Sequence, residues 1–396
     1  MLLPALITIF SSLFALPCRS PTGASVEWFI MLKSPTVAHS NPFLKNGSSY
    51  TYIDATSKVV KFLSKDITAK NSPLALTLAP LYNNQAETSF MYNDDTPDGK
   101  TGQSYGHTKG VIGQAANEGF WLVHSVPQFP PVPSSGYSFN AKSLTYGQSY
   151  MCMTLDNTNL NKVGMHQQRN HPQIYHHSIS ARAAAAMPNL AAAMNGTFLS
   201  RTPSAASETI KGTKSTPFMV FSKNAPWGKD IQSALIQPTL KTGMIWETWM
   251  RPRNDPICDS VNKPPRDCLS AITLTAGCDG STAEDVDWDE YAGKPSYQPP
   301  FFYPENMDSA SSFTWRETDD HSKWGVTSTS NGTSVATCIG DVNRMTSQTK
   351  RGGGYVCTMD RGVHQSFSAL ITTHDKCTRS TSNSRGFVRS LLSKLF

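Results

Sequence analysis

The feature that most limits the fold of this sequence is a motif that occurs twice: a histidine, one intervening residue and a lysine. The copies are His107-Thr108-Lys109 and His321-Ser322-Lys323, in opposite halves of the chain. Each lies in a segment whose residues predict a β-strand. Since residues i and i+2 of a strand point to the same side, each copy aims an imidazole and an ammonium at one place.

The same pattern of a strand, a reversal and a returning strand follows both motifs. After the first motif, Val111-Ile112 continues the strand, residues 114–119 form a loop and residues 120–125 return. After the second, Asn331-Gly332 is a strong turn dipeptide and residues 335–343 return. The repetition indicates a duplicated unit.

Two such motifs facing each other would provide the groups that phosphodiester cleavage needs. One imidazole can attack phosphorus, the other can protonate the departing oxygen, and the two ammonium groups can hold the phosphate oxygens. The alternative is that each histidine and lysine is simply exposed on its strand. So short a motif often occurs by chance in unrelated proteins. The residues alone therefore leave both interpretations open.

Further candidates lie on the two returning strands. His124 is near the end of the first one, where it can orient His107 or accept a proton; it can equally be a half-buried histidine. Asp341 and Asn343 alternate on the second one, where an Asn can donate to a phosphate oxygen and an Asp can orient an imidazole. Ordinary turn composition explains them as well. Arg351 and the three glycines after it can present a guanidinium and N–H groups to a phosphate.

Several features indicate an exported protein. Residues 1–16 form a short apolar run that predicts a cleaved signal peptide, and no other segment reaches spanning length. The cysteine count is even, which implies disulfides in an exported chain. Three Asn-Gly-Ser/Thr sequons, at Asn46, Asn195 and Asn331, fit a glycosylating compartment. The cysteines are Cys18, Cys152, Cys258, Cys268, Cys278, Cys338, Cys357 and Cys377.

Charge and ligand spacing limit the partners. The formal charge of +6 suits binding to a polyanion such as DNA, but it is also ordinary for a mildly basic protein. The chain has no long Lys/Arg run, so it has no basic tail or arm. No Cys-x-x-Cys pair occurs, and the spacing of the four histidines between 166 and 177 matches no familiar ligand pattern. The sequence therefore predicts no bound metal and no cofactor.

The chain divides into two halves around a variable segment. We expect an N-terminal half at 17–177, a linker at 178–216 and a C-terminal half at 217–396, with an acidic, Pro-rich insertion at about 279–308. Residues 26–32 and 50–54 predict strands that open the first half. Alanine runs between 183 and 193 predict an exposed helix, and residues 229–240 an amphipathic one.

Taken together, six motifs resemble deoxyribonuclease II, and the resemblance extends from about Cys18 to Cys377. It is strong around the motifs and poor from about 178 to 300. The motifs are Gly106-His-Thr-Lys-Gly110, Gly119-Phe-Trp-Leu-Val-His-Ser-Val-Pro127, Tyr146-Gly-Gln-Ser149, Asp320-His-Ser-Lys-Trp324, Gly340-Asp-Val-Asn-Arg344 and Arg351-Gly-Gly-Gly354.

The resemblance implies a mixed α/β fold of two pseudo-symmetric, phospholipase D-like halves, each a central β-sheet flanked by helices. It implies a metal-independent acid endonuclease, secreted or in the lysosomal lumen, that leaves 3′-phosphate ends through a phosphohistidine. Of the catalytic groups, we expect His107 to be the nucleophile and His321 the acid, with Lys109 and Lys323 holding the phosphate. Asn343 matches the family's phosphate-binding Asn, and we expect His124 and Asp341 to support substrate binding.

The resemblance also implies disulfides, with one departure. Cys18–Cys152 and Cys258–Cys357 look like the retained bridges. Gly325 replaces the cysteine that usually follows His-Ser-Lys-Trp, so Cys338 is expected to be free or paired with Cys268 or Cys278.

Two other functions remain open. One is a catalytically inactive secreted homologue that binds DNA or a host partner. The other is a phospholipase D-like enzyme that acts on lipid or another phosphodiester. The sequence does not decide whether the chain forms a homodimer.

Overall fold

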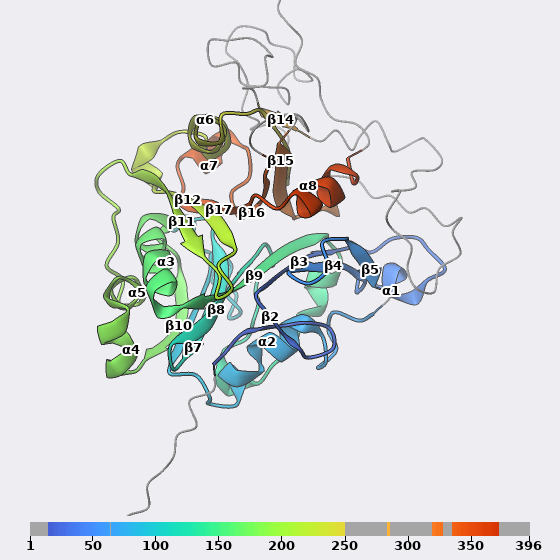
Figure 1. The fold of residues 1–396 in the computed structure, drawn as a ribbon, viewed down its shortest axis with the longest axis horizontal. Coiled ribbons are helices and arrows are strands. Elements are labelled where there is room, and N and C mark those ends of the chain that lie inside the picture. The colour runs from blue at the N-terminus through green and yellow to red at the C-terminus, as the bar shows by residue number, and fades with distance from the viewer. Residues whose placement is uncertain (1–14, 64, 250–282, 286–318, 328–334, 372–396) are drawn as a thin grey trace, which may run out of the picture.

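The fold is a mixed α/β arrangement built around two large β-sheets (Figure 1). The computed structural model describes residues 15–63, 65–249, 283–285, 319–327 and 335–371. A small pair of strands, β1 (Cys18–Arg19) and β2 (Ser25–Val26), opens the described chain. The prediction of a mixed α/β fold is confirmed.

The first sheet has eight strands in the order β10-β6-β7-β8-β9-β3-β4-β5, and every neighbouring pair is antiparallel. In chain order the strands are β3 (Trp28–Lys33), β4 (Tyr50–Asp54), β5 (Lys61–Leu63), β6 (Thr88–Asn93), β7 (Lys109–Ala115), β8 (Glu118–His124), β9 (Gln148–Asp156) and β10 (Ile174–Ile179). The predicted hairpin after the first motif is therefore present as β7 and β8. Its loop is shorter than expected, because Gln114 and Ala115 still pair with Gly119 and Glu118.

The second sheet has seven strands in the order β11-β12-β17-β16-β15-β13-β14. All neighbours are antiparallel except β13 and β14, which run parallel. The strands are β11 (Ala205–Lys211), β12 (Pro217–Lys223), β13 (Met244–Thr248), β14 (Ala283–Asp285), β15 (Lys323–Thr327), β16 (Thr337–Gly340) and β17 (Gly353–Thr358). Here β15 and β16 are the strands that the second motif predicts, but β16 is shorter than the expected 335–343. Asp341 and Asn343 therefore lie just after the strand and do not alternate on it.

The two sheets share a strand order. The run β3-β9-β8-β7-β6 of the first sheet matches β12-β17-β16-β15-β13 of the second, with antiparallel neighbours throughout. Registers match too: Lys109 pairs with Asn93 and Lys323 with Thr248, the last residues of β6 and β13. The repeat seen in the sequence is thus a repeat of strand topology. The boundaries at 17–177 and 217–396 stay a prediction.

Helices pack on both sheets. The bounds are α1 (Pro42–Lys45), α2 (Pro73–Tyr82), α3 (Asn157–Asn170), α4 (Ala181–Ala186), α5 (Pro188–Met194), α6 (Gln237–Leu240), α7 (Thr346–Thr349) and α8 (Arg361–Ser368). Helices α2 and α6 lie on the outer faces, while α3, α5 and α8 contribute side chains to the core shared by the two sheets. A π-helical turn, Gln232–Ile236, leads into α6, where one amphipathic helix was expected. The helix expected between 183 and 193 is present as α4 and α5, but it is not simply exposed, because Leu190 and Met194 are buried in the central apolar cluster. Residues 205–211, expected to be linker, form β11.

Three apolar clusters hold these layers together. The central cluster takes side chains from both sheets, among them Phe90 and Trp324. A second lies between α2 and the outer face of the first sheet, and a third between α6 and the outer face of the second. Burial of this kind stabilises by roughly 25 cal/mol per Å² of apolar surface, so the shared central cluster fixes one sheet against the other.

Two disulfides are present in the described part of the chain. Cys18–Cys152 forms as expected. The expected Cys258–Cys357 bridge is wrong, because Cys357 pairs with Cys338. The two residues lie opposite each other on β16 and β17, which places their side chains on the same face as cross-strand neighbours. Cys258, Cys268, Cys278 and Cys377 lie outside the described residues.

The segment expected to be a signal peptide lies almost wholly outside the described residues, and so do the tail after 377 and most of the 279–308 insertion, of which β14 is described. Among the described helices, none has the length and apolar character that crossing a bilayer requires.

Candidate active site

The first motif stands at the start of β7. Lys109 is the first residue of that strand, and His107 lies just before it, so the predicted strand begins later than expected. The His107 main-chain N–H donates to the carbonyl of Gly352 (2.9 Å), in the loop before β17. The ring Nδ1 is hydrogen-bonded to the carbonyl oxygen of Asp341. His107 is thus held by main-chain groups from the other sheet's loops.

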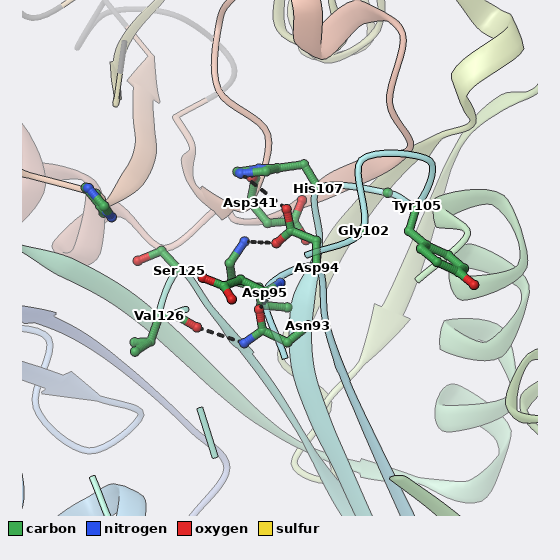
Figure 2. Close-up of polar contacts among 12 residues, drawn as sticks. Asn93, Asp94, Asp95, Gly102, Tyr105, His107, Ser125, Val126 and Asp341 are labelled. Carbon is green, nitrogen blue, oxygen red and sulfur yellow. Dashed lines mark hydrogen bonds and ion pairs between the residues drawn. The ribbon is translucent and has the colours of Figure 1, made fainter. Parts of the chain in front are cut away.

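A buried carboxylate, Asp94, lies in the middle of this half of the site. Figure 2 shows it gathered with His107 and Asp341, while the ring of Tyr105 points away from them. The Lys109 ammonium donates to Oδ1 of Asp94. Oδ2 accepts from the Arg351 guanidinium at 2.9 Å and lies 3.8 Å from Nε2 of His107.

The charges around Asp94 decide its protonation. Burial alone would raise the pKa of this carboxyl, but Lys109, His107 and Arg351 together hold the pKa well below its usual range. The carboxylate therefore stays ionised in acid. The ionised carboxylate holds the Lys109 ammonium by accepting a hydrogen bond from one of its three N–H groups.

Sequence reasoning missed Asp94, which lies between β6 and the first motif. Its place follows from β6, because Asn93 ends that strand and pairs with Lys109. An acidic residue just beyond a strand that neighbours the motif strand is a usable signal, but only when the pairing of the strands is known.

Arg351 ties the loop before β17 to the loop that carries His107. Its Nε donates to the carbonyl of Tyr105 (3.0 Å), and one terminal nitrogen donates to the carbonyls of Gly102 (3.1 Å) and Gly106 (3.3 Å) as well as to Asp94. The sequence suggested that this guanidinium faces a phosphate. In the structure it binds protein oxygens and holds the His107 loop.

The second motif is placed in the same way at the start of β15. Lys323 begins the strand, and the main-chain N–H of His321 donates to the carbonyl of Gly147 (2.9 Å), in the loop before β9. The Lys323 N–H donates to Oγ of Ser149 (3.1 Å), and its ammonium donates to the His321 carbonyl. The motif of each sheet is therefore held by the loop of the other sheet.

Aromatic rings surround His321. The Tyr146 ring stacks on the imidazole at 4.1 Å between centroids and 15° between planes. The Trp249 ring lies 4.0 Å away at 46°. His107 thus has ionic neighbours and His321 has aromatic ones.

The residues that differ between the surroundings of His107 and those of His321 occupy equivalent positions in the two halves. Asp94 follows the last residue of β6, and Trp249 follows the last residue of β13, each pairing partner of a motif lysine. Arg351 and Tyr146 each precede the glycine whose carbonyl accepts from a motif histidine. The same framework therefore offers two chemically different environments.

The two motifs influence each other's charge. Burial is the main reason that the pKa of Lys323 falls to about 7, and the ammonium of Lys109 lowers it further. Burial also lowers the pKa of His107 well below its usual value; Lys109, Arg351 and Lys323 add to this effect, while Asp94 opposes it. Each motif thus lies within the electrostatic influence of the other motif's lysine.

Asp341 is buried beside His107, but it contacts the histidine through its main chain. Its Oδ1 accepts from the N–H of Gly354 (2.9 Å). Burial is the main cause that raises the pKa of Asp341 to about 6. The group that orients the imidazole is thus a peptide carbonyl, where the sequence suggested a carboxylate.

Asn343 lies next to the second motif. The next residue, Arg344, donates its N–H to Oγ1 of Thr248 (3.1 Å), which pairs with Lys323. The Asn343 side chain is buried, and its Oδ1 has no hydrogen-bond partner within the described chain. Because Oδ1 is an acceptor, the group that would complete it is a hydrogen-bond donor.

His124 is fully buried next to Lys109, since it follows Val123, which pairs with Gly110. Its Nδ1 accepts from the N–H of Val126 (3.2 Å), and Phe129 packs against the ring. Burial lowers the pKa of His124 to about 3. The neutral imidazole therefore packs beside Lys109 and does not become protonated in mild acid.

Two of the three predicted glycosylation sites fall in the described chain. Asn46 and Asn195 are both exposed, as an acceptor must be, and Asn331 lies outside the described residues. Within the described ranges, no three His, Cys, Asp or Glu side chains are grouped so as to hold a metal ion.

Comparison with known proteins shows the family of this chain. The family model described as Deoxyribonuclease II matches residues 17–377. Deoxyribonuclease-2-alpha of Rattus norvegicus is 31% identical over 92% of this chain and 95% of its own. Plancitoxin-1 of Acanthaster planci and Cell death-related nuclease 6 of Caenorhabditis elegans are each 28% identical, over 92% and 93% of this chain and 93% and 91% of their own. With both motifs in place along so complete a match, the chain belongs to the deoxyribonuclease II family.

Proposed function

We propose that this protein is an acid endodeoxyribonuclease in which His107 attacks the phosphorus of DNA and His321 protonates the leaving oxygen. The observation that carries the proposal is the hydrogen bond between Nδ1 of His107 and the carbonyl of Asp341. A carbonyl oxygen can only accept, so Nδ1 carries the proton and Nε2 keeps its lone pair. The lowered pKa of His107 keeps that lone pair available in acid.

The reaction proceeds in two displacements. Nε2 of His107 forms a bond to phosphorus while the bond to the 5′-oxygen breaks, and the imidazolium of His321 gives that oxygen its proton. Water then attacks the phosphohistidine and loses a proton to the neutral His321. The phosphorus–nitrogen bond breaks, which leaves a 3′-phosphate end and restores both rings.

Positive charge for the transition state comes from the protein in this proposal. Lys109 and Lys323 would stabilise the charge that develops on the non-bridging oxygens, and the Asn343 amide would donate to them. Asp94 would keep the Lys109 ammonium in place, and His124 would pack beside it. The proposal therefore includes activity without a divalent metal ion.

The proposed location is the secretory pathway or lysosomal lumen. Two disulfides fit an oxidising compartment, and two exposed sequons fit glycosylation there. Cleavage of residues 1–16 as a signal peptide stays part of the same proposal.

The test is nicking of supercoiled plasmid at about pH 5 in excess chelator, where an imidazole of ordinary pKa is protonated. We expect open-circular and then linear DNA, with ends that a polymerase extends only after phosphatase treatment. DNA binding without cleavage would support the inactive homologue. Release of headgroup from phosphatidylcholine, with DNA intact, would support the lipid enzyme.

The pKa of Lys323 predicts how DNA binding depends on pH. Because this pKa is lowered from 10.5 to about 7, the ammonium is charged below about pH 7 and neutral above it. We expect a His107→Ala variant, which binds without cutting, to lose affinity for a short duplex as the pH rises through 7. The slope of log affinity against log salt should fall by about 0.9, the value of one lost phosphate contact.

Replacing Lys323 by arginine in that variant is the matched control. A guanidinium keeps its charge, so the fall near pH 7 should disappear. An unchanged midpoint in the double variant would mean that a group other than Lys323 titrates there.

A further inference from the structure

Two buried lysines outside the His-x-Lys motifs occupy equivalent positions in the two sheets. Lys33 is the last residue of β3 and pairs with Gln148 of β9. Lys223 is the last residue of β12 and pairs with Gly353 of β17. Since β3 and β12 correspond in the repeated strand order, the lysines are counterparts.

Each ammonium uses its three donors on main-chain carbonyls. Nζ of Lys33 donates to the carbonyls of Ser34 (2.7 Å), Gly47 (2.8 Å) and Leu144 (3.0 Å). Nζ of Lys223 donates to three carbonyls in and after α7, those of Gln348 (2.9 Å), Thr349 (3.1 Å) and Arg351. An ammonium has no more donors to give, so both hydrogen-bond sets are complete.

Holding a lysine in this way is unfavourable in itself. Burial is the main cause that lowers the pKa of Lys33 to about 7 and that of Lys223 to about 8. An apolar side chain of similar volume often serves the stability of a fold equally well. What an ammonium adds is the ability to fix several carbonyls around one point.

In each set, one of the carbonyls lies next to the loop that holds a motif histidine. Leu144 ends a short 3-10 helix (Ala141–Leu144), and the loop after it contains Tyr146, which stacks on His321, and Gly147, whose carbonyl accepts the His321 N–H. Arg351 immediately precedes Gly352, which accepts the N–H of His107. Each lysine therefore lies one loop away from the histidine of the opposite half.

We propose that Lys33 and Lys223 are paired positioning residues that act crosswise: Lys33 sets the place of His321, and Lys223 sets the place of His107. Neither lysine touches the reacting atoms. The inference rests on the proposed function only in taking these two histidines as the active groups.

The test is the effect of each lysine on the two imidazoles, measured by NMR on protein with labelled histidine. Ring signals of His107 and His321 are identified from the spectra of the His107→Ala and His321→Ala proteins. We expect Lys33→Met to shift and broaden the His321 signals and leave those of His107 in place. Lys223→Met should do the reverse.

Controls separate this crosswise effect from general loss of structure. Lys61→Met alters an exposed lysine on β5 and should move neither signal. If a methionine variant does not fold, the corresponding glutamine variant, Lys33→Gln or Lys223→Gln, is used instead, because its side-chain amide can still donate a hydrogen bond. Equal shifts of both histidines, shifts in the same half, or no shift would each overturn the proposal.

Kinetics provide a second readout. Displacement of a reacting group by about 1 Å costs roughly 100-fold in rate, so we expect kcat on DNA to fall by up to that factor with KM little changed. If crosswise shifts appear and the unaltered protein cuts no DNA, the proposed function fails and the positioning stands. If the protein cuts DNA and the shifts are not crosswise, the positioning fails alone.

Discussion

Replacing His107 by alanine is expected to abolish DNA cleavage, with a loss of at least about 10⁴-fold, because the proposed mechanism assigns the covalent intermediate to this residue. Replacing His321 should cost roughly 10²–10⁴-fold, the usual contribution of a general acid. Both proteins should keep the unfolding transition of the parent. The measurement is initial rate on plasmid DNA with circular dichroism on the same samples.

A substrate with a good leaving group separates the two roles. In the p-nitrophenyl ester of thymidine 3′-phosphate, nitrophenolate leaves without needing a proton. The His321→Ala protein should therefore regain much of its first-step rate on this ester, and the His107→Ala protein should not. The reverse pattern would exchange the two roles, and an active double variant would remove both residues from the mechanism. His177→Ala, at an exposed position on β10, is the matched control.

Changing Asp94 to asparagine is expected to cost both stability and activity. The substitution keeps the shape of the side chain and removes the charge that balances the buried Lys109 and Arg351. Leaving one partner of a buried ion pair uncompensated typically costs 3–5 kcal/mol. We expect a loss of about that size in urea unfolding, together with a fall in kcat/KM because Lys109 loses its anchor. The carboxylate of Asp98 is exposed and pairs with an exposed lysine, so Asp98→Asn should change neither quantity.

The pH dependence of this loss has a definite sign. Because the pKa of Asp94 is lower in the folded protein than its usual 3.8, its contribution to stability is complete above that value and is lost as the pH falls below it. The difference between parent and variant should therefore be constant from neutral pH to about 4 and shrink in stronger acid. A difference that already shrinks between pH 7 and 5 would show that Asp94 is not held in its ionised form.

Local patterns in the sequence revealed those parts of the site that depend on neighbouring residues. The two His-x-Lys motifs, their hairpins and the presence of helices near 190 follow from spacing and turn residues, which act over a few positions. Asp94 did not follow, because its role depends on β6 lying beside β7. The Cys338–Cys357 bridge did not follow either, since it depends on the register of β16 against β17.

The longest-range features were beyond any local pattern. Arg351 reaches the loop at Gly102 and Tyr105 from the far end of the chain, and Lys33 reaches Leu144. Nothing in the composition around these residues distinguishes a buried lysine from an exposed one. Only the packing of the two sheets brings these partners within hydrogen-bond distance.

The two matching contacts that each half makes with the motif of the other, His107 to Gly352 and His321 to Gly147, run between an N–H and a carbonyl, groups that almost every residue possesses. A contact made from such groups does not depend on the side chain of either residue that forms it. Natural selection was thus free to put a carboxylate and a guanidinium beside one imidazole and two aromatic rings beside the other. A framework of matching halves can in this way accommodate two unlike chemical tasks without losing the alignment that both of them require.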